Sequence, residues 1–413
     1  MSSLDHAIET IQRSGQPIVI FGAGVVGEVI LSACTAQGLS VACFCDNNIN
    51  KTKSLFCDTR VVHTSALKSE YSQANIIISA ADIHDVIKQL AELELATWFP
   101  GSIFLKNVNV YENTYSAPAD FVDYAVNTCI LSQNGYLETD KLYLRSVDII
   151  ITERCSLKCA DCSNLMQYYE KPQNCVTEDV IESIQNFCKY VDEVNEFRVI
   201  GGEPFVNKDI HIITKTLIDE TKVKNIVIYT NGTISPKDSQ IEYLKHEKVL
   251  VLITDYGHLS KNLDKLIRTL QDNGIRYYVD QAGGWTDCSA ISKHNRTEAG
   301  KRQIFTECCA KNTFTLSDSK FYRCPFAANM GRLNIVPEEK ADFIDLSDPT
   351  IRARSVSVVK KQIKAYITEL DYLSVCDHCN GRSFDAPEIE PAIQLKKYLQ
   401  LDITQLHVSN KYE

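Results

Sequence analysis

A regular alternation of strand-like and helix-like segments between residues 146 and 285 limits this part of the chain to a parallel α/β architecture. Short runs rich in Val and Ile, typical of buried parallel strands, alternate with longer stretches of helical periodicity. The predicted strands are 147–152, 196–200, 225–230, 249–254 and 275–280. The predicted helices are 177–190, 210–220, 238–247 and 262–273. Successive βα units predict a partial (β/α) barrel, in which the chemistry lies on loops at the C-terminal ends of the strands.

An N-terminal segment, residues 1–110, carries a second α/β pattern. A predicted strand runs into the sequence GAGVVG, a helix follows, and the next strand ends at Asp46. Gly22 allows a tight turn, Gly24 lets a phosphate approach the backbone, and Gly27 lets the helix pack against the strand. The segment resembles a Rossmann-like domain with a phosphate site at these glycines and Asp46. The alternative is a glycine loop kept for packing that binds no ligand.

The amino-acid composition indicates the cellular compartment of the protein and excludes some classes of binding partner. The chain has 43 Lys and Arg against 53 Asp and Glu, a formal charge of −10, which argues against a nucleic acid or an anionic membrane as a partner. No run approaches the roughly 20 apolar residues that span a bilayer, and the N-terminus does not read as a signal peptide. We therefore expect a cytoplasmic protein whose 16 cysteines are reduced, some of them as metal ligands.

Three cysteines follow the first predicted barrel strand with the spacing CxxxCxxC: Cys155, Cys159 and Cys162. Three thiolates on one loop are too few for a closed tetrahedral zinc site without a distant fourth ligand. They suit three corners of a [4Fe–4S] cluster and leave one iron open to another ligand. A structural zinc site is the alternative.

This loop resembles the signature of the radical S-adenosylmethionine (radical SAM) superfamily, and motifs at the next strand ends extend the resemblance over about residues 146–280. The second strand ends in a GGEP sequence similar to the methionine-binding motif of the family. Asp161 departs from the family pattern, because an aromatic residue or His usually contacts the adenine there. The residues implied to bind S-adenosylmethionine are Gly201, Gly202, Glu203, Pro204, Thr230, Asn231, Asp255 and Asp161.

The resemblance implies an enzyme that uses S-adenosylmethionine as a radical source. The open iron would bind the amino and carboxylate groups of S-adenosylmethionine, and Glu203 would accept from its ammonium. One electron, delivered by a reductase, flavodoxin or ferredoxin, would cleave the sulfonium to give methionine and a 5′-deoxyadenosyl radical, which abstracts hydrogen from a substrate. Tyr256 and Trp285 are candidates for lining the substrate pocket, with barrel packing as the alternative.

Cysteines return in residues 286–413, where the possible ligands are Cys308, Cys309, Cys324, Cys376 and Cys379. A hairpin is predicted to deliver Cys324. Four thiolates hold either zinc or a [4Fe–4S] cluster. Because adjacent cysteines seldom both reach one small cluster, we favour Cys309 over Cys308 as the ligand. The region resembles the twitch extension of radical SAM enzymes, a shortened SPASM domain, which implies one auxiliary [4Fe–4S] cluster. Cys288 is interpreted as an ordinary thiol.

The sequence predicts an α/β chain of four parts and leaves the substrate open. The parts are 1–110 (Rossmann-like), 111–145 (connecting segment), 146–285 (partial barrel) and 286–413 (twitch or SPASM-like). We favour a nucleotide-linked or phosphorylated small substrate, such as an activated sugar or aminocyclitol, because of the phosphate-holding pattern in the first part. A maturase of ribosomally made peptides is the alternative. A non-catalytic iron–sulfur electron-transfer protein is disfavoured, because such a protein needs no methionine-binding loop.

Overall fold

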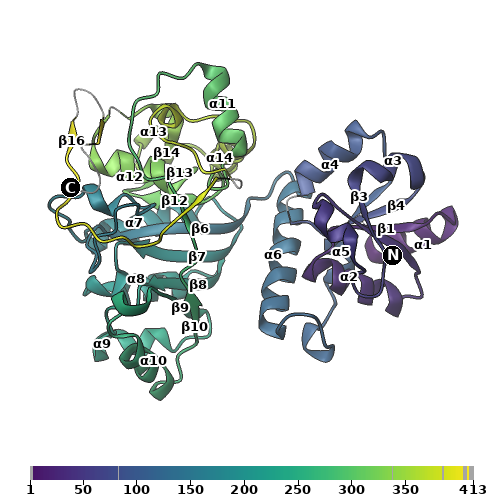
Figure 1. Cartoon of the computed structure of the whole chain (residues 1–413), viewed down its shortest axis with the longest axis horizontal. Helices are drawn as coiled ribbons and strands as arrows, with labels where there is room; N and C mark the ends of the chain where they lie inside the picture. The colour runs from purple at the N-terminus through teal and green to yellow at the C-terminus, as the bar shows by residue number, and fades with distance from the viewer. Residues whose placement is uncertain (1–2, 82, 337, 384–385, 403–406, 409–413) are drawn as a thin grey trace. The chain divides into compact units, whose positions relative to one another are not determined.

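The chain divides into two compact units, Met1–Arg145 and Ser146–Glu413, which are described in turn (Figure 1). The computed structural model describes residues 3–81, 83–336, 338–383, 386–402 and 407–408. Within these ranges no helix is both long and apolar enough to cross a membrane.

A five-stranded parallel sheet in the order β3-β2-β1-β4-β5 forms the middle of the N-terminal unit. Its strands are β1 (Ile18–Phe21), β2 (Val41–Asp46), β3 (Val61–His63), β4 (Asn75–Ile78) and β5 (Trp98–Pro100). All residues of β1 and β4 are buried, as expected for central parallel strands with both faces covered. The strand order reverses beside β1, so the glycine loop that follows β1 lies where α/β sheets bind ligands.

The predicted connecting segment, residues 111–145, contains a helix of the N-terminal unit. The helices of this unit are α1 (Ser3–Ser14), α2 (Val25–Ala36), α3 (Leu67–Glu70), α4 (Ile83–Glu92), α5 (Ser102–Leu105) and α6 (Ala119–Leu137). Helix α6 buries Val122, Val126 and Cys129 in the same core as α2. Buried Gln133 interrupts its apolar pattern, and this side chain is satisfied by the carbonyl oxygens of Ile78 and Ala80. Because this polar residue stands in the core, the apolar periodicity of the segment is broken and does not predict the helix.

One mixed sheet of eight strands runs through the C-terminal unit in the order β10-β9-β8-β7-β6-β12-β13-β14, from the bottom to the top of Figure 1. The strands of the partial barrel are β6 (Tyr143–Thr152), β7 (Glu193–Gly201), β8 (Val223–Thr230), β9 (Val249–Asp255) and β10 (Tyr277–Gln281). The remaining strands of the sheet are β12 (Phe314–Ser317), β13 (Lys320–Tyr322) and β14 (Phe343–Asp345). Strand β12 pairs in parallel with β6, so the hairpin β12–β13 extends the barrel sheet.

Helices connect the barrel strands and place the βα loops at one edge of the sheet. They are α7 (Thr177–Cys188), α8 (Ile210–Asp219), α9 (Asp238–Leu244) and α10 (Leu263–Asp272). The later helices are α11 (Glu298–Glu307), α12 (Pro325–Leu333), α13 (Pro349–Arg352) and α14 (Val356–Thr368). Two short antiparallel pairs complete the strands: β11 (Trp285–Thr286) with β15 (Glu388–Ile389), and β16 (Leu401–Asp402) with β17 (His407–Val408). The loops after β6, β7, β8 and β9 carry the motifs singled out in the sequence.

Candidate active site and thiol clusters

Backbone hydrogen bonds join the cysteine loop after β6 to the glycine motif after β7. The Gly202 N–H donates to the Thr152 carbonyl at 3.0 Å, and the Glu203 N–H donates to the Arg154 carbonyl at 2.8 Å. A Cβ atom would lie 2.1 Å from the Thr152 oxygen at Gly201, and 2.2 Å from the Arg154 oxygen at Gly202. Only glycine allows this approach. The structure therefore brings the two predicted motifs side by side.

The Glu203 side chain links the glycine motif to the end of β8. It is fully buried, and its carboxylate accepts from the Thr230 hydroxyl at 2.9 Å, the Asn231 N–H at 2.9 Å and the Phe205 N–H at 3.1 Å. Burial raises the pKa of Glu203 to about 7, although these donors act in the opposite direction. The following residue, Pro204, is buried and begins a short 3₁₀ turn. The carboxylate predicted to meet the ammonium group is thus held in a fixed position.

Each thiol of the cysteine loop faces N–H donors. The donors are Asn231 Nδ2 at 3.6 Å from Cys155 Sγ, Gln394 Nε2 at 3.3 Å from Cys159 Sγ, and the backbone N–H groups of Asn164 and Met166 on Cys162. Burial, and then the charge of nearby thiols, raises the pKa of all three, that of Cys159 to about 12. Thiolates are stable here when a positive metal lies beside them. The thiols and their N–H donors fit an iron–sulfur cluster.

In the part of the chain that the structure describes, no group of three or more His, Cys, Asp or Glu side chains is arranged to hold one metal ion. The ligands of zinc converge on one ion, whereas the thiolates of a [4Fe–4S] cluster bind different iron atoms.

Two other predicted contacts of S-adenosylmethionine lie in different surroundings. Asp161 is 5% exposed, and its Oδ1 lies 3.5 Å from the Ser289 hydroxyl. Asp255, at the end of β9, is partly exposed and accepts from the Gly257 N–H and from Gln281 Nε2, each at 2.8 Å. Asp161 is therefore packed inside the unit, and Asp255 lies nearer to solvent.

Tyr256 lies beside the cysteine loop. Burial, and then the charges of Cys159, Cys162 and Cys155, raises the pKa of its hydroxyl. Its ring packs edge-on against Trp285, with 5.9 Å between the ring centroids. The structure thus brings these two candidate pocket residues together near the thiols.

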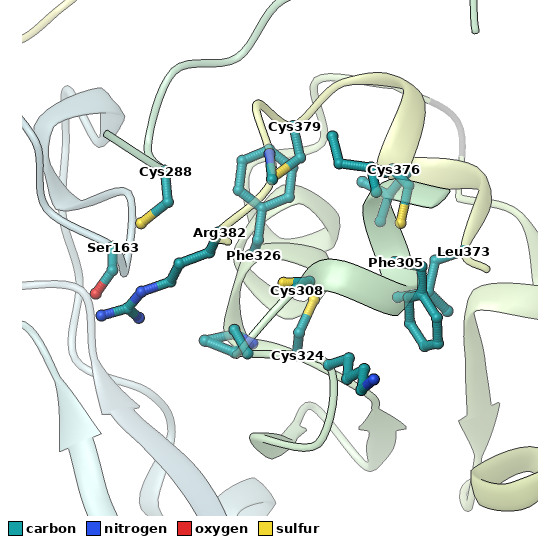
Figure 2. Close-up of a pocket in the computed structure, with 16 residues that line it drawn as sticks. Ser163, Cys288, Phe305, Cys308, Cys324, Phe326, Leu373, Cys376, Cys379 and Arg382 are labelled. Carbon is teal, nitrogen blue, oxygen red and sulfur yellow. The ribbon is translucent and has the colours of Figure 1, made fainter. Parts of the chain in front are cut away.

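A second group of thiols lines a pocket in the C-terminal part of this unit (Figure 2). Its cysteines are Cys288, Cys308, Cys324, Cys376 and Cys379. Cys308 and not Cys309 is among the lining residues, which favours Cys308, the thiol that the sequence analysis set aside. Cys308 ends α11 with an extended backbone, in which successive side chains point in opposite directions.

Local contacts fix three of the pocket thiols. Cys324 directly precedes α12, and its Sγ accepts from the Ala327 N–H at 3.5 Å. The Arg296 guanidinium donates to the carbonyl oxygens of Cys376 at 2.7 Å and Cys379 at 2.9 Å. These bonds close the CxxC turn and present both thiols to the pocket.

Two residues near the thiols carry no signal in the sequence. Cys288 is 8% exposed and faces the thiol pocket near Ser163, which follows the cysteine loop (Figure 2). Gln394 reaches Cys159 from a segment 235 residues further along the chain. Neither residue stands at motif spacing from another ligand, so only the folded chain reveals them.

The N-terminal glycine loop is fixed by Asp46 and a lysine. Asp46 Oδ2 accepts from the Ala23 N–H at 3.0 Å and from Lys51 Nζ at 2.8 Å. Lys51 Nζ also donates to the Ala23 carbonyl at 2.8 Å. Burial acts to raise the pKa of Asp46, but Lys51 and backbone N–H groups hold it below its ordinary value. Asp46 is therefore an ionised carboxylate that supports the loop.

Two glycines of this loop, Gly24 and Gly27, differ in the space around them, and a pair of alanine variants can measure the effect of this difference on stability. A Cβ atom at Gly27 would lie 2.2 Å from the Gly22 carbonyl oxygen, whereas one at Gly24 would meet nothing within 4 Å. We expect Gly27→Ala to lower the free energy of unfolding by about 1–3 kcal/mol and Gly24→Ala by less than about 1 kcal/mol. Urea denaturation of both variants measures this; equal losses would contradict the packing role of Gly27.

Comparison with known proteins shows that the barrel segment matches a protein family. The sequence model of the Radical SAM superfamily matches residues 149–280. The mitochondrial GTP 3′,8-cyclase of Arabidopsis thaliana is 36% identical over 112 residues, 27% of each chain. The GTP 3′,8-cyclase of Clostridium acetobutylicum is 28% identical over 143 residues, 32% of this chain and 44% of the relative. The chain thus spans less than half the length of these relatives. Among solved structures, BtrN in complex with AdoMet and 2-DOIA aligns with a TM-score of 0.36 and 11% identity, over 58% of this chain and 94% of that one.

Proposed function

Residues 149–280 form a radical SAM domain, and on that basis we propose that the protein is an enzyme that cleaves S-adenosylmethionine reductively. With a reduced [4Fe–4S] cluster bound, this chemistry yields methionine and a 5′-deoxyadenosyl radical that abstracts hydrogen from a substrate. The observation that carries the proposal is the hydrogen-bonded junction of the cysteine loop, the glycine motif and the end of β8 around buried Glu203.

In this proposal a few residues of the junction have separate roles in binding the cluster and S-adenosylmethionine. Cys155, Cys159 and Cys162 hold the cluster, because three thiols with N–H donors leave one iron for another ligand. The glycine motif and Glu203 hold the ammonium group of S-adenosylmethionine, since a fixed carboxylate is a strong partner for a cation. Asn231 contacts both groups: its N–H donates to Glu203, and its Nδ2 faces Cys155.

We propose an auxiliary [4Fe–4S] cluster in the thiol pocket, bound by four of its cysteines: Cys308, Cys324, Cys376 and Cys379. A cluster ligated by four cysteines relays electrons and does not bind substrate, so its role would be to accept or pass on an electron in a net oxidation. A flavodoxin, ferredoxin or reductase is proposed as the external electron donor.

Two adjacent cysteines provide a matched test of this second cluster. Cys308→Ala is expected to remove about four iron atoms per chain, whereas Cys309→Ala is expected to leave the iron content unchanged. Only the first of these thiols faces the pocket. Iron and sulfide analysis after anaerobic reconstitution measures the difference. Iron loss in the Cys309 variant instead, or in neither, would count against the ligand set.

For the substrate we propose a nucleotide-linked or phosphorylated small molecule. The support is the glycine loop of the N-terminal unit, which leads into the N-terminus of α2 and in which Gly24 has open space around it. Two relatives that match part of this chain are named GTP 3′,8-cyclases, so a nucleotide substrate has a precedent among its relatives.

The experiment is an assay of 5′-deoxyadenosine with the reconstituted protein, dithionite and S-adenosylmethionine, repeated with nucleotide sugars and with short peptides. Formation of 5′-deoxyadenosine supports the proposal, and a rise caused by a nucleotide sugar supports the substrate class. A rise caused only by peptides would favour the maturase. Redox-active clusters without any 5′-deoxyadenosine would favour the electron-transfer protein.

A further inference from the structure

Residues 392–399, here called the C-terminal strap, pair with the cysteine loop (Figure 1, yellow). The Ala160 N–H donates to the Ile393 carbonyl at 2.8 Å, and the Leu395 N–H donates to the Lys158 carbonyl at 2.7 Å. Cys159 and Gln394 face each other in an antiparallel bridge between these two bonds. The strap therefore lies against the backbone on both sides of the middle cysteine.

Further contacts fix the strap beyond this bridge. The Leu399 N–H donates to the Gln167 carbonyl at 2.8 Å, five residues after the last cysteine of the loop. Lys158 Nζ lies 4.1 Å from the centroid of the Tyr398 ring, a cation–π contact. The strap is thus attached to the loop and to the turn that follows it.

The side-chain amide of Gln394 has a defined orientation. Its Oε1 accepts from the Lys158 N–H at 2.8 Å, and its Nε2 donates to the Ala392 carbonyl at 2.8 Å. The second hydrogen of Nε2 is directed at Cys159 Sγ, 3.3 Å away. Because the oxygen is already bonded to a backbone N–H, a flipped amide would lose both backbone bonds. The protein therefore presents a donor, and not an acceptor, to this sulfur.

We propose that Gln394 is a positioning residue that raises the reduction potential of the cluster on the cysteine loop. The inference rests on the proposed function, which places a [4Fe–4S] cluster on Cys159. Reduction adds negative charge to the cluster and its thiolates, and an N–H donor to sulfur stabilises the more negative form. A cluster with this donor is therefore easier to reduce than the same cluster without it.

Gln394→Glu is the most informative variant, because it keeps the acceptor for the Lys158 N–H and removes the Nε2 donor to Cys159, together with its bond to the Ala392 carbonyl. We expect at least a tenfold lower ratio of reduced to oxidised cluster at a fixed potential, equivalent to a negative shift of about 59 mV for one electron. Redox titration followed by electron paramagnetic resonance measures it. The control is Gln362→Glu on α14, where the amide oxygen accepts from Arg354. The control is expected to titrate like the parent.

A second readout does not need the cluster. In the protein without iron, Gln394→Leu is expected to speed hydrogen exchange at the Lys158 amide, which loses its acceptor, while Gln394→Glu leaves it protected. The Ala160 amide stays protected in both, because its partner is the backbone of Ile393. Equal potentials in the parent and Gln394→Glu, with the cluster present in both, would overturn this inference alone. Absence of a cluster from the parent would overturn the proposed function as well.

Discussion

A variant with Cys155, Cys159 and Cys162 all changed to Ala is expected to form no 5′-deoxyadenosine and to contain about four iron atoms per chain, against about eight in the parent. The loss should be complete, because in the proposed function these three thiols are the protein ligands of the cluster that cleaves S-adenosylmethionine. Each of them faces N–H donors in the structure. Iron analysis and the 5′-deoxyadenosine assay on reconstituted protein measure the two effects separately.

The matched control is Cys188→Ala, which removes a buried thiol from α7 outside the loop. This control should keep the iron and the 5′-deoxyadenosine of the parent. Four iron atoms in the parent and none in the triple variant would remove the auxiliary cluster from the proposal. Zinc in place of iron, without 5′-deoxyadenosine, would contradict the whole assignment.

Glu203→Gln is expected to weaken binding of S-adenosylmethionine by roughly tenfold to a hundredfold, the usual cost of losing a hydrogen bond to a charged group. The pKa of Glu203, raised to about 7 by burial, adds a pH dependence. Below pH 7 the parent carboxyl becomes protonated and loses its attraction for the ammonium group, so its affinity should fall toward that of the variant. Equilibrium binding at pH 6 and pH 8 tests this.

Folding stability should show the opposite dependence on pH. A carboxyl with a pKa of about 7 in the folded protein, against an ordinary value of 4.5, binds its proton more tightly when folded. This tighter proton binding adds to the free energy of unfolding, and the addition is complete below about pH 4.5. The added stability is lost as the pH rises through 7, which lowers the free energy of unfolding by roughly 3 kcal/mol. The parent should therefore lose stability relative to Glu203→Gln between pH 5 and pH 8. The exposed control Glu178→Gln should follow the parent. Identical slopes for the parent and Glu203→Gln would contradict the burial of an ionised Glu203.

The barrel and the meeting of its motifs are predictable from the sequence because both follow from strand geometry. Apolar runs fix the parallel strands, and the C-terminal ends of such strands share one edge. The glycine motif and Asn231 therefore had to lie near the cysteine loop, and the structure shows the bonds that join them. Helix α6 was missed for a different reason: a buried glutamine replaces an apolar residue in its core-facing side.

Features that depend on contacts between distant parts of the chain could not be predicted from the sequence. Whether Cys308 or Cys309 turns toward the pocket depends on how α11 ends and how the chain then pairs with Arg382, whose carbonyl accepts from the Cys309 N–H at 2.7 Å. The donor on Cys159 comes from Gln394, for which neither periodicity nor motif spacing provides a signal. Local sequence identifies the candidate thiols, and tertiary pairing decides which of them face one another and what surrounds them.

The pairing of the C-terminal strap with the cysteine loop also sets an order of events during synthesis. Gln394 leaves the ribosome 235 residues after Cys159. At roughly 5–20 residues per second, this interval is about ten to fifty seconds. The three cysteines, the glycine motif and the end of β8 are all made before the strap exists. On the nascent chain the backbone groups of Lys158 and Ala160 therefore lack the partners that Leu395 and Ile393 later provide.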